Sequence, residues 1–228
     1  MEYKKAQPAG GERACVLCKG ADPAQVTALD DLIPAGRSRF IAVTKHLVAV
    51  PTFGCFVPGY LLIVPRTHVL AFGQLPAAAL EETRALVDDL ATRLHVIYRL
   101  PILAFEYGLA SPGLRRIEHA HWHLLPSVAD LAGWLGRRLD GQTLGSLADL
   151  PADHSYIAVR SQDKILRVYS AGRDGDEARR THERIRLRRA VAMLDPRIDD
   201  ANWDWAEHRR ADLIAATVTD LATSPATR

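Results

Sequence analysis

The chain has 228 residues, of which 48% are hydrophobic and 25% are charged, and its formal net charge is +2. This composition is typical of a globular protein with a sizeable core, and the small net charge gives no reason to expect nucleic acid as a partner. No apolar run reaches the roughly 18 residues that a membrane-spanning helix needs, and the polar residues 1–5 lack the apolar stretch of a signal peptide. We therefore expect a cytoplasmic protein with no membrane partner.

The N-terminal part of the chain holds a polar segment followed by a cysteine pair. Residues 1–12 carry glycine and proline, and we expect a mobile N-terminus there. Cys15 and Cys18 form a Cys-x-x-Cys pair, and Cys55 makes the cysteine count odd, which disfavours a disulfide framework. In a reducing compartment such a pair predicts a metal clip or a redox pair. No thioredoxin-like βαβ pattern follows it, which favours the metal clip.

The next hundred residues predict short strands around one long helix. Apolar residues at helical spacing predict an amphipathic helix over 77–99. The apolar run at 59–65, which is bounded by glycine and proline, predicts a buried strand. The other elements expected here are a strand pair within 39–50, a loop at 51–58, a strand at 102–107 and a loop at 108–114.

Three histidines at alternate positions follow this loop, at His119, His121 and His123. If residues 117–126 form a strand, the period of two places all three imidazoles on one face and the intervening apolar residues on the other. Imidazole acts as a nucleophile, a proton carrier and a metal ligand near neutral pH. The row therefore predicts a working site.

The pattern changes after residue 127. We expect an α+β fold with a mostly antiparallel sheet in a domain at 13–127, and an α+β extension at 128–228 packed on it. The elements expected in the extension are a helix at 128–139, a linker at 144–151, a hairpin from 156–159 and 165–169, a loop at 170–177, and helices at 178–194 and 205–221.

The run at 119–125, His-Ala-His-Trp-His-Leu-Leu, resembles the signature of the histidine triad (HIT) family. Residues 58–68, with Gly59 and His68, resemble the family's Gly-x-x-Leu-x-Ile-Pro-Lys-x-His segment. Phe105-Glu106-Tyr107-Gly108, Arg188-Arg189 and Trp203-Asp204-Trp205 resemble motifs of a bacterial subgroup with long C-terminal extensions.

The resemblance implies a HIT-like fold and a nucleotide hydrolase or nucleotidyltransferase, related to dinucleoside polyphosphate hydrolases and galactose-1-phosphate uridylyltransferases. By position in the signature, His121 is the nucleophile that attacks an α-phosphate, and the reaction passes through a covalent nucleotidyl-histidine. The other ring nitrogen of His121 should donate to a backbone carbonyl, which fixes the tautomer. His123 would contact phosphoryl oxygens or assist the leaving group.

The resemblance also implies a structural zinc ion and a homodimer. The ligands that zinc-bearing members use match Cys15, Cys18, His68 and His119. Two thiolates and two imidazoles form a closed tetrahedral set.

Two positions depart from the family pattern and shape the substrate-binding hypothesis. Arg115 and Arg116 stand where members often carry a Gly-Gln or Gly-Ser that contacts phosphate, and arginine can grip phosphate in a bidentate manner. Thr52 stands where an acidic residue usually holds the ribose hydroxyls, which makes an unusual nucleotide conjugate more plausible as the substrate. Glu106 either orients the histidines or satisfies a strand end.

Two other functions stay open. The departures at Thr52 and at Arg115-Arg116 are also compatible with a non-catalytic nucleotide-binding or regulatory protein. The histidine row is compatible with a metallohydrolase that uses His119, His121 and His123 as a His₃ metal site.

Overall fold

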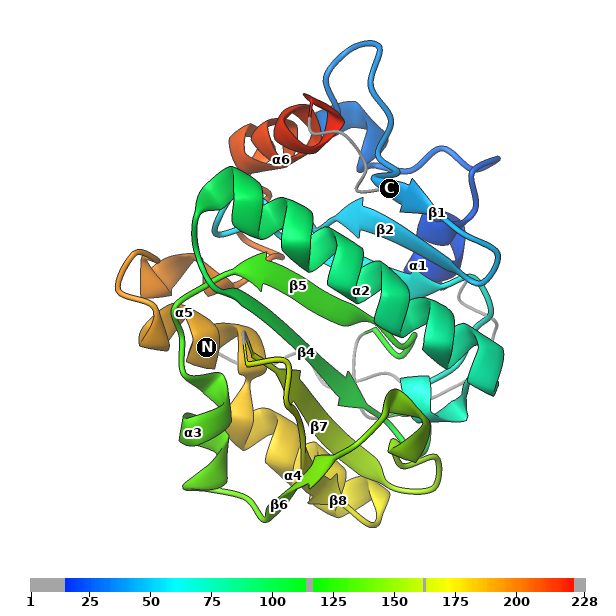
Figure 1. The fold of residues 1–228 in the computed structure, drawn as a ribbon, viewed down its shortest axis with the longest axis vertical. Helices are drawn as coiled ribbons and strands as arrows, with labels where there is room; N and C mark the ends of the chain where they lie inside the picture. The colour runs from blue at the N-terminus through cyan, green and yellow to red at the C-terminus, as the bar shows by residue number, and fades with distance from the viewer. Residues whose placement is uncertain (1–14, 114–116, 162, 224–228) are drawn as a thin grey trace.

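The computed structural model describes residues 15–113, 117–161 and 163–223, and in them the chain forms an α+β fold around one sheet (Figure 1). Eight strands pair antiparallel in the order β1-β2-β3-β5-β4-β7-β8-β6. The expected α+β class and mostly antiparallel sheet are therefore confirmed. The strands are β1 (Ala42–Val43), β2 (Leu47–Pro51), β3 (Leu61–Pro65), β4 (Ile102–Gly108), β5 (Trp122–Pro126), β6 (Gly141–Leu144), β7 (Ser155–Arg160) and β8 (Leu166–Gly172).

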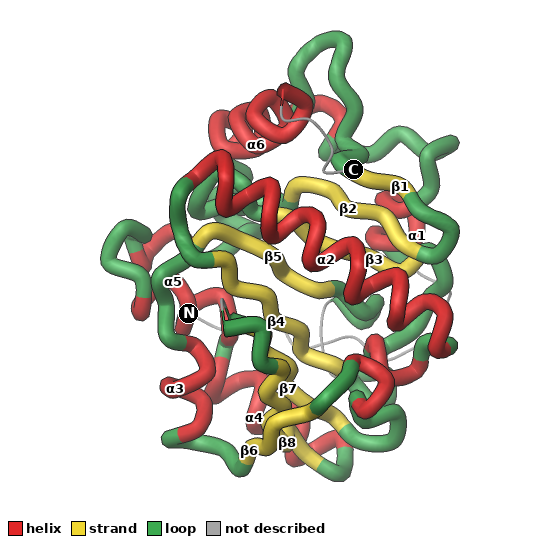
Figure 2. Tube along the Cα trace, in the orientation of Figure 1, coloured by secondary structure: helices red, strands yellow, loops and turns green. Residues whose placement is uncertain are grey.

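Helices cover both faces of this sheet, as the tube in Figure 2 shows for α2 on the near face. The 22-residue helix α2 packs one face, while α1, α3 and α5 contribute buried residues to the core on the opposite face. The helices are α1 (Val16–Ala21), α2 (Ala77–Tyr98), α3 (Leu131–Gly136), α4 (Gly175–Ile185), α5 (Leu187–Leu194) and α6 (Ala211–Thr223). Short 3₁₀ helices lie at Asp30–Leu32, Phe72–Gln74, Leu147–Asp149 and Asp200–Trp203.

The central strands are mostly apolar because both of their faces are covered. In β2, Leu47 and Ala49 lie in the core under α2, whereas Val48 and Val50 lie in the core on the opposite face. We call these two cores the α2 face and the extension face.

Residues after 127 continue the same sheet. Strand β7 pairs with β4, with Phe105 opposite Val159, and β8 and β6 follow it. The expected hairpin of the extension thus adds strands beside β4. The division of the chain at residue 127 stays a prediction.

Three expected helices have different bounds. Of the helix expected at 128–139, only α3 forms. The side chain of Asp130 accepts a hydrogen bond from Gly133 N at the start of this helix. The helix expected at 178–194 is divided into α4 and α5 by Arg186, whose φ of 41° lies in the left-handed region. Helix α6 begins at Ala211 instead of 205 because Arg210 is also left-handed, with φ of 53°.

Strand β6 occupies residues 141–144, a segment for which the sequence predicted no strand. Pairing with β8, which only the tertiary fold supplies, makes this exposed segment a strand. The expected mobile N-terminus at 1–12 lies outside the described residues. Within the described part of the chain, no helix has the length and apolarity needed to cross a bilayer.

Candidate functional site

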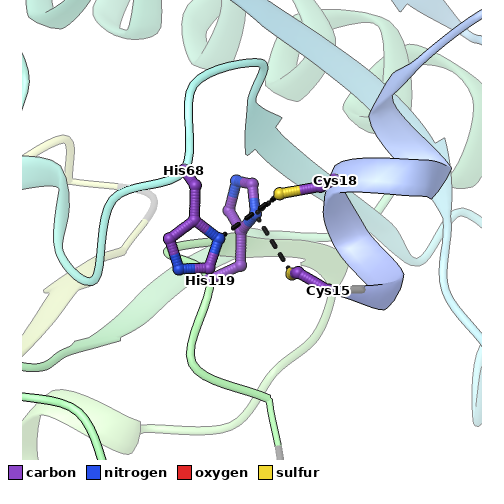
Figure 3. Close-up of side chains that lie close together, drawn as sticks. All are labelled: Cys15, Cys18, His68 and His119. Atoms are coloured by element: carbon purple, nitrogen blue, oxygen red, sulfur yellow. Dashed lines mark hydrogen bonds between the residues drawn. The ribbon is translucent and has the colours of Figure 1, made fainter. Parts of the chain in front are cut away.

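Cys15, Cys18, His68 and His119 come together from three separate segments (Figure 3). The cysteines belong to the start of α1, His68 follows β3, and His119 precedes β5. One donor atom from each residue lies within 4.8 Å of all the others. Cys18 Sγ is 3.3 Å from Nδ1 of both His68 and His119, and Cys15 Sγ is 3.5 Å from His119 Nδ1. Two sulfurs and two imidazole nitrogens at this spacing fit a tetrahedral zinc ion, whose ligands lie about 2.0–2.3 Å from the metal.

The imidazole of His119 is oriented by its second nitrogen. Its Nε2 lies 2.8 Å from the Pro65 carbonyl oxygen, which can only accept, so Nε2 carries the proton and Nδ1 offers its lone pair to the cluster. The side chain is fully buried, and burial lowers the pKa of His119 to about 4, with the nearby His68 acting in the same direction. A neutral imidazole is the form that binds a metal.

The two thiols lie close enough to affect each other. Burial raises the pKa of Cys18 to about 11, and the hydrogen bond and charge of Cys15 act in the same direction. Both cysteines have free thiols. A cation bound between the two sulfurs would stabilise the thiolate form of Cys18 against this shift. The four residues therefore form a candidate metal centre.

His121 has one of its ring nitrogens engaged with the backbone. Its Nδ1 lies 2.7 Å from the His119 carbonyl oxygen and donates its proton to it. In the neutral ring, the lone pair then resides on Nε2. The side chain is half-buried. This arrangement fixes the orientation of the His121 ring, with the nucleophilic lone pair on Nε2.

His123 lies on β5 between Leu62 of β3 and Phe105 of β4. The Phe105 ring stacks on its imidazole, with centroids 4.5 Å apart and planes at 18°. The Tyr60 hydroxyl oxygen lies 2.8 Å from His123 Nδ1. The centroids of His121 and His123 are 4.8 Å apart. The two imidazoles therefore form a pair, and His123 is held on two sides.

The histidine row is not entirely within a strand, which corrects the expectation for 117–126. Strand β5 begins at Trp122, so His119 and His121 lie in the preceding segment. Pairing with β3 stops there because the Pro65 carbonyl accepts from the His119 side chain and Ala120 N donates to the Val69 carbonyl.

The alternation itself continues through this segment. Ala120, Trp122 and Leu124 all lie in the α2-face core. The His119 ring turns toward His68, at 4.9 Å between centroids, whereas His121 meets His123. The row is thus divided between the metal centre and the histidine pair.

The structure places Thr52 beside Tyr60 at the end of the β2–β3 ladder, where Thr52 N donates to the Tyr60 carbonyl at 3.3 Å. Its side chain is buried, and its hydroxyl donates to the Phe53 carbonyl at 3.1 Å. Thr52 therefore lies close to the residues around His123, with its hydroxyl engaged by the backbone.

Glu106 lies on the opposite side of the sheet from the histidine pair. Its neighbour Phe105 stacks on His123, and the alternation of β4 directs Glu106 to the α2 face. Its carboxylate accepts from Phe72 N at 2.9 Å and from the Tyr156 hydroxyl at 2.7 Å. Burial, and then the proximity of this carboxylate, raise the pKa of Tyr156 well above its ordinary value. Both of these partners lie on the α2 face, so the sheet separates Glu106 from His121 and His123. Arg115 and Arg116 lie outside the described residues.

Two residues near His123 were missing from the sequence-based site, Tyr60 and Arg188. Tyr60 follows Gly59 in the predicted buried strand, and nothing in that apolar run marks it as part of a site. Arg188 belongs to α5, more than sixty residues after the histidines. Its guanidinium carbon lies 5.1 Å from the Tyr60 ring centroid and 5.0 Å from that of Phe56. The Arg188-Arg189 motif marked this position, but no local pattern places it beside the histidine pair.

No protein-family model matches the chain, and no curated protein matches it. Among solved structures, it is similar to a Hit-like protein involved in cell-cycle regulation from Bartonella henselae, at 17% identity and a TM-score of 0.34, over 43% of this chain and 70% of that chain. A Zn-bound histidine triad family protein from Mycobacterium smegmatis matches at 15% identity and a TM-score of 0.35, over 51% of this chain and 76% of that chain. A HIT family member from Bacillus subtilis matches at 17% identity and a TM-score of 0.37, over 50% of this chain and 72% of that chain. Their descriptions name the family that residues 119–125 resemble. At these identities and TM-scores, the matches establish nothing about the activity, substrate or metal of this chain.

Proposed function

We propose that the chain is a histidine triad nucleotide hydrolase or nucleotidyltransferase that acts through a covalent nucleotidyl-His121 intermediate. The observation that carries this proposal is the hydrogen bond from His121 Nδ1 to the His119 carbonyl, at 2.7 Å. It assigns the proton to Nδ1 and leaves Nε2 as a nucleophile next to a second imidazole, His123. The triad signature in the sequence supports the same assignment.

In the first step, Nε2 of His121 attacks the α-phosphorus of a nucleotide in line with the leaving group. A phosphorus–nitrogen bond forms, the bond to the leaving group breaks, and the leaving atom takes the electron pair and the Nε2 proton of His123, whose Nδ1 in turn receives the hydroxyl proton of Tyr60. In the second step, water or another acceptor attacks the phosphorus and gives its proton to Nε2 of His123, whose Nδ1 returns the other proton to Tyr60. The phosphorus–nitrogen bond then breaks and its electron pair returns to His121.

Cys15, Cys18, His68 and His119 would hold zinc, and the bound ion would supply a structural cross-link between α1 and the segment that carries His121. The carbonyl that accepts the hydrogen bond from His121 belongs to His119, which is one of these four residues. The cluster therefore acts on catalysis by positioning the backbone at His119. By family resemblance, we also propose a cytoplasmic homodimer that binds a nucleotide or nucleotide conjugate.

The geometry supports this zinc site over a His₃ metallohydrolase. Nδ1 of His119 points to the two sulfurs, and Nε2 donates to Pro65. His119 therefore has no nitrogen left for a metal shared with His121 and His123.

The test of the proposed function replaces His121 with Asn in the full chain. Wild type and variant are assayed on dinucleoside polyphosphates, nucleotide sugars and nucleoside phosphoramidates. We expect the wild type to turn over at least one of these substrates. In the variant, kcat should be lower by about 10⁴-fold, the size typical of removing a nucleophile that works with a partner base. His154→Asn is the matched control, because His154 is exposed and pairs with Asp153.

Full activity of His121→Asn on a substrate that the wild type turns over would refute the nucleophile assignment. Nucleotide binding without turnover of any of the three substrate classes would favour the non-catalytic protein. Metal retained in a Cys15/Cys18 double variant would favour the His₃ site.

A further inference from the structure

The β2–β3 loop beside the histidine pair is held by three separate parts of the C-terminal extension. From α5, Arg188 donates to the Gly54 carbonyl through Nη2. Gly54 N donates to the Arg209 carbonyl at 3.1 Å, and Gly59 N donates to the Thr217 hydroxyl of α6 at 2.8 Å. Tyr60 follows this loop directly, so the extension determines where the Tyr60 ring lies.

Arg188 is itself fixed in position by the backbone. Its Nε donates to the Trp203 carbonyl at 3.1 Å, in addition to the bond with Gly54. These two contacts hold the guanidinium over the rings of Phe56 and Tyr60. The planar, permanently charged group therefore lies next to the phenol that contacts His123.

Tyr60 is a neutral phenol at physiological pH. Burial raises the pKa of Tyr60 to about 12, although the charge of Arg188 acts in the opposite direction. The hydroxyl has one proton and lies 2.8 Å from His123 Nδ1. In this hydrogen bond the hydroxyl is either the donor or the acceptor.

The charge of Arg188 selects between these two arrangements. A cation beside a hydroxyl attracts the oxygen lone pairs and repels the hydroxyl proton, so the O–H bond points away from the guanidinium. The Tyr60 hydroxyl therefore donates its proton to the hydrogen bond with Nδ1 of His123. A neutral His123 that accepts at Nδ1 carries its own proton on Nε2. Phe105, stacked on the ring, keeps the imidazole from rotating.

We propose that Arg188 is a positioning residue for His123 and acts through Tyr60. It holds the Tyr60 hydroxyl as the donor to Nδ1 of His123, so that Nε2 of His123 presents a proton to the leaving group. This proposal rests on the proposed function for its effect on catalysis, but the tautomer of His123 can be measured without turnover. In this way the C-terminal extension contributes to the chemistry of the histidine pair.

The first test is a long-range ¹H–¹⁵N NMR experiment on the ¹⁵N-labelled full chain, which identifies the protonated nitrogen of each histidine. His123 signals are assigned by their loss in His123→Gln. In the wild type, we expect the tautomer with the proton on Nε2. In Arg188→Gln and in Tyr60→Phe, we expect a mixture of the two tautomers. Arg189→Gln is the matched control, because Arg189 is exposed and is the neighbour of Arg188.

The second test compares substrates that share a nucleotide and differ in the leaving group. A group such as a nitrophenolate leaves without a proton, whereas an alkyl amine or alcohol needs one. We expect Arg188→Gln and Tyr60→Phe to lower kcat about 10- to 100-fold with the poor leaving group, a part of the effect of general acid catalysis, and less than about threefold with the good one.

Three results would overturn the proposal. One is a wild-type His123 with its proton on Nδ1, and another is an unchanged tautomer in both variants. The third is an equal loss of kcat with both leaving groups. If Arg188→Gln does not fold, Tyr60→Phe answers the same questions, and Arg188→Lys, which keeps the positive charge, should keep the wild-type tautomer. A chain that turns over no nucleotide would refute the proposed function and leave the NMR result to decide the tautomer.

Discussion

Nδ1 of His121 lies 2.7 Å from the carbonyl oxygen of His119, so the proposed nucleophile is oriented by the residue whose own side chain belongs to the candidate metal centre. The backbone of one residue thus joins the two parts of the site. Loss of the metal should disturb the orientation of His121 as well as the stability of the fold.

Replacing Cys18 with Ser should remove the metal and destabilise the protein. Cys18 Sγ contacts both histidines of the cluster, and a metal bound only by the folded chain contributes its binding energy to folding. We expect zinc content measured by mass spectrometry to fall from one per chain to near zero, and the free energy of unfolding to fall by about 4 kcal/mol or more. Cys55→Ala, away from the cluster, should keep its zinc. Full zinc content in Cys18→Ser would refute the ligand assignment.

The metal-free chain should lose stability as the pH falls from about 6.5 to about 4. The pKa of His119 is lowered to about 4 in the folded state, so the unfolded chain binds a proton in this window and the folded chain does not. The contribution of His119 is therefore complete above pH 6.5 and decreases by roughly 3 kcal/mol on acidification.

Urea unfolding of EDTA-treated protein at pH 7, 5.5 and 4.5 measures this loss. The wild type is compared with His119→Gln, in which the residue no longer titrates and the loss should be smaller by that amount. Equal pH dependence of the two proteins would contradict the assignment.

Changing Glu106 to Gln should affect stability and leave catalysis intact. The carboxylate accepts from Phe72 N and from the Tyr156 hydroxyl, and the amide can accept at only one of these positions. We expect a loss of about 1–3 kcal/mol in the free energy of unfolding, with kcat within about twofold of the wild type. A large fall in kcat with unchanged stability would show that Glu106 does act on the histidines.

Gly54→Ala tests the contact between the β2–β3 loop and the extension. Gly54 has a φ of 63°, and a Cβ added there would lie 2.4 Å from the Trp205 Cα. Gly36→Ala is the matched control, because Gly36 has a φ of 74° and open space around it. Both variants bear the cost of a left-handed alanine, about 1 kcal/mol, and only Gly54→Ala must also displace the extension. We expect its melting temperature to be the lower of the two, and equal melting temperatures would contradict this packing.

The sequence predicted the parts of the fold that depend on local apolar patterns. Residues 59–65 and 77–99 correspond to β3 and α2, because a short apolar run between glycine and proline and a helical stripe each depend on nearby residues. Strand β6 and the break at Arg186 depend on contacts and a backbone conformation that no local pattern encodes.

The candidate site follows the same division. Cys15, Cys18, His68 and His119 were expected together because their motifs resemble those of a family, and the structure brings them together. Period-two alternation also directs Glu106 away from the histidines, once the strand is known to run through Phe105. The contact of Arg188 with Tyr60 joins segments separated by more than a hundred residues, and spacing within the chain says nothing about it.

The most direct test of the proposed function is to trap the covalent intermediate. The chain is incubated with a nucleotide substrate labelled at the α-phosphate, quenched in alkali because a phosphorus–nitrogen bond is labile in acid, and digested for mass spectrometry. The account predicts a nucleotidyl group on the peptide that contains His121, and none in His121→Asn. Substrate turnover by the wild type with no labelled peptide, or a label that persists in His121→Asn, would contradict it.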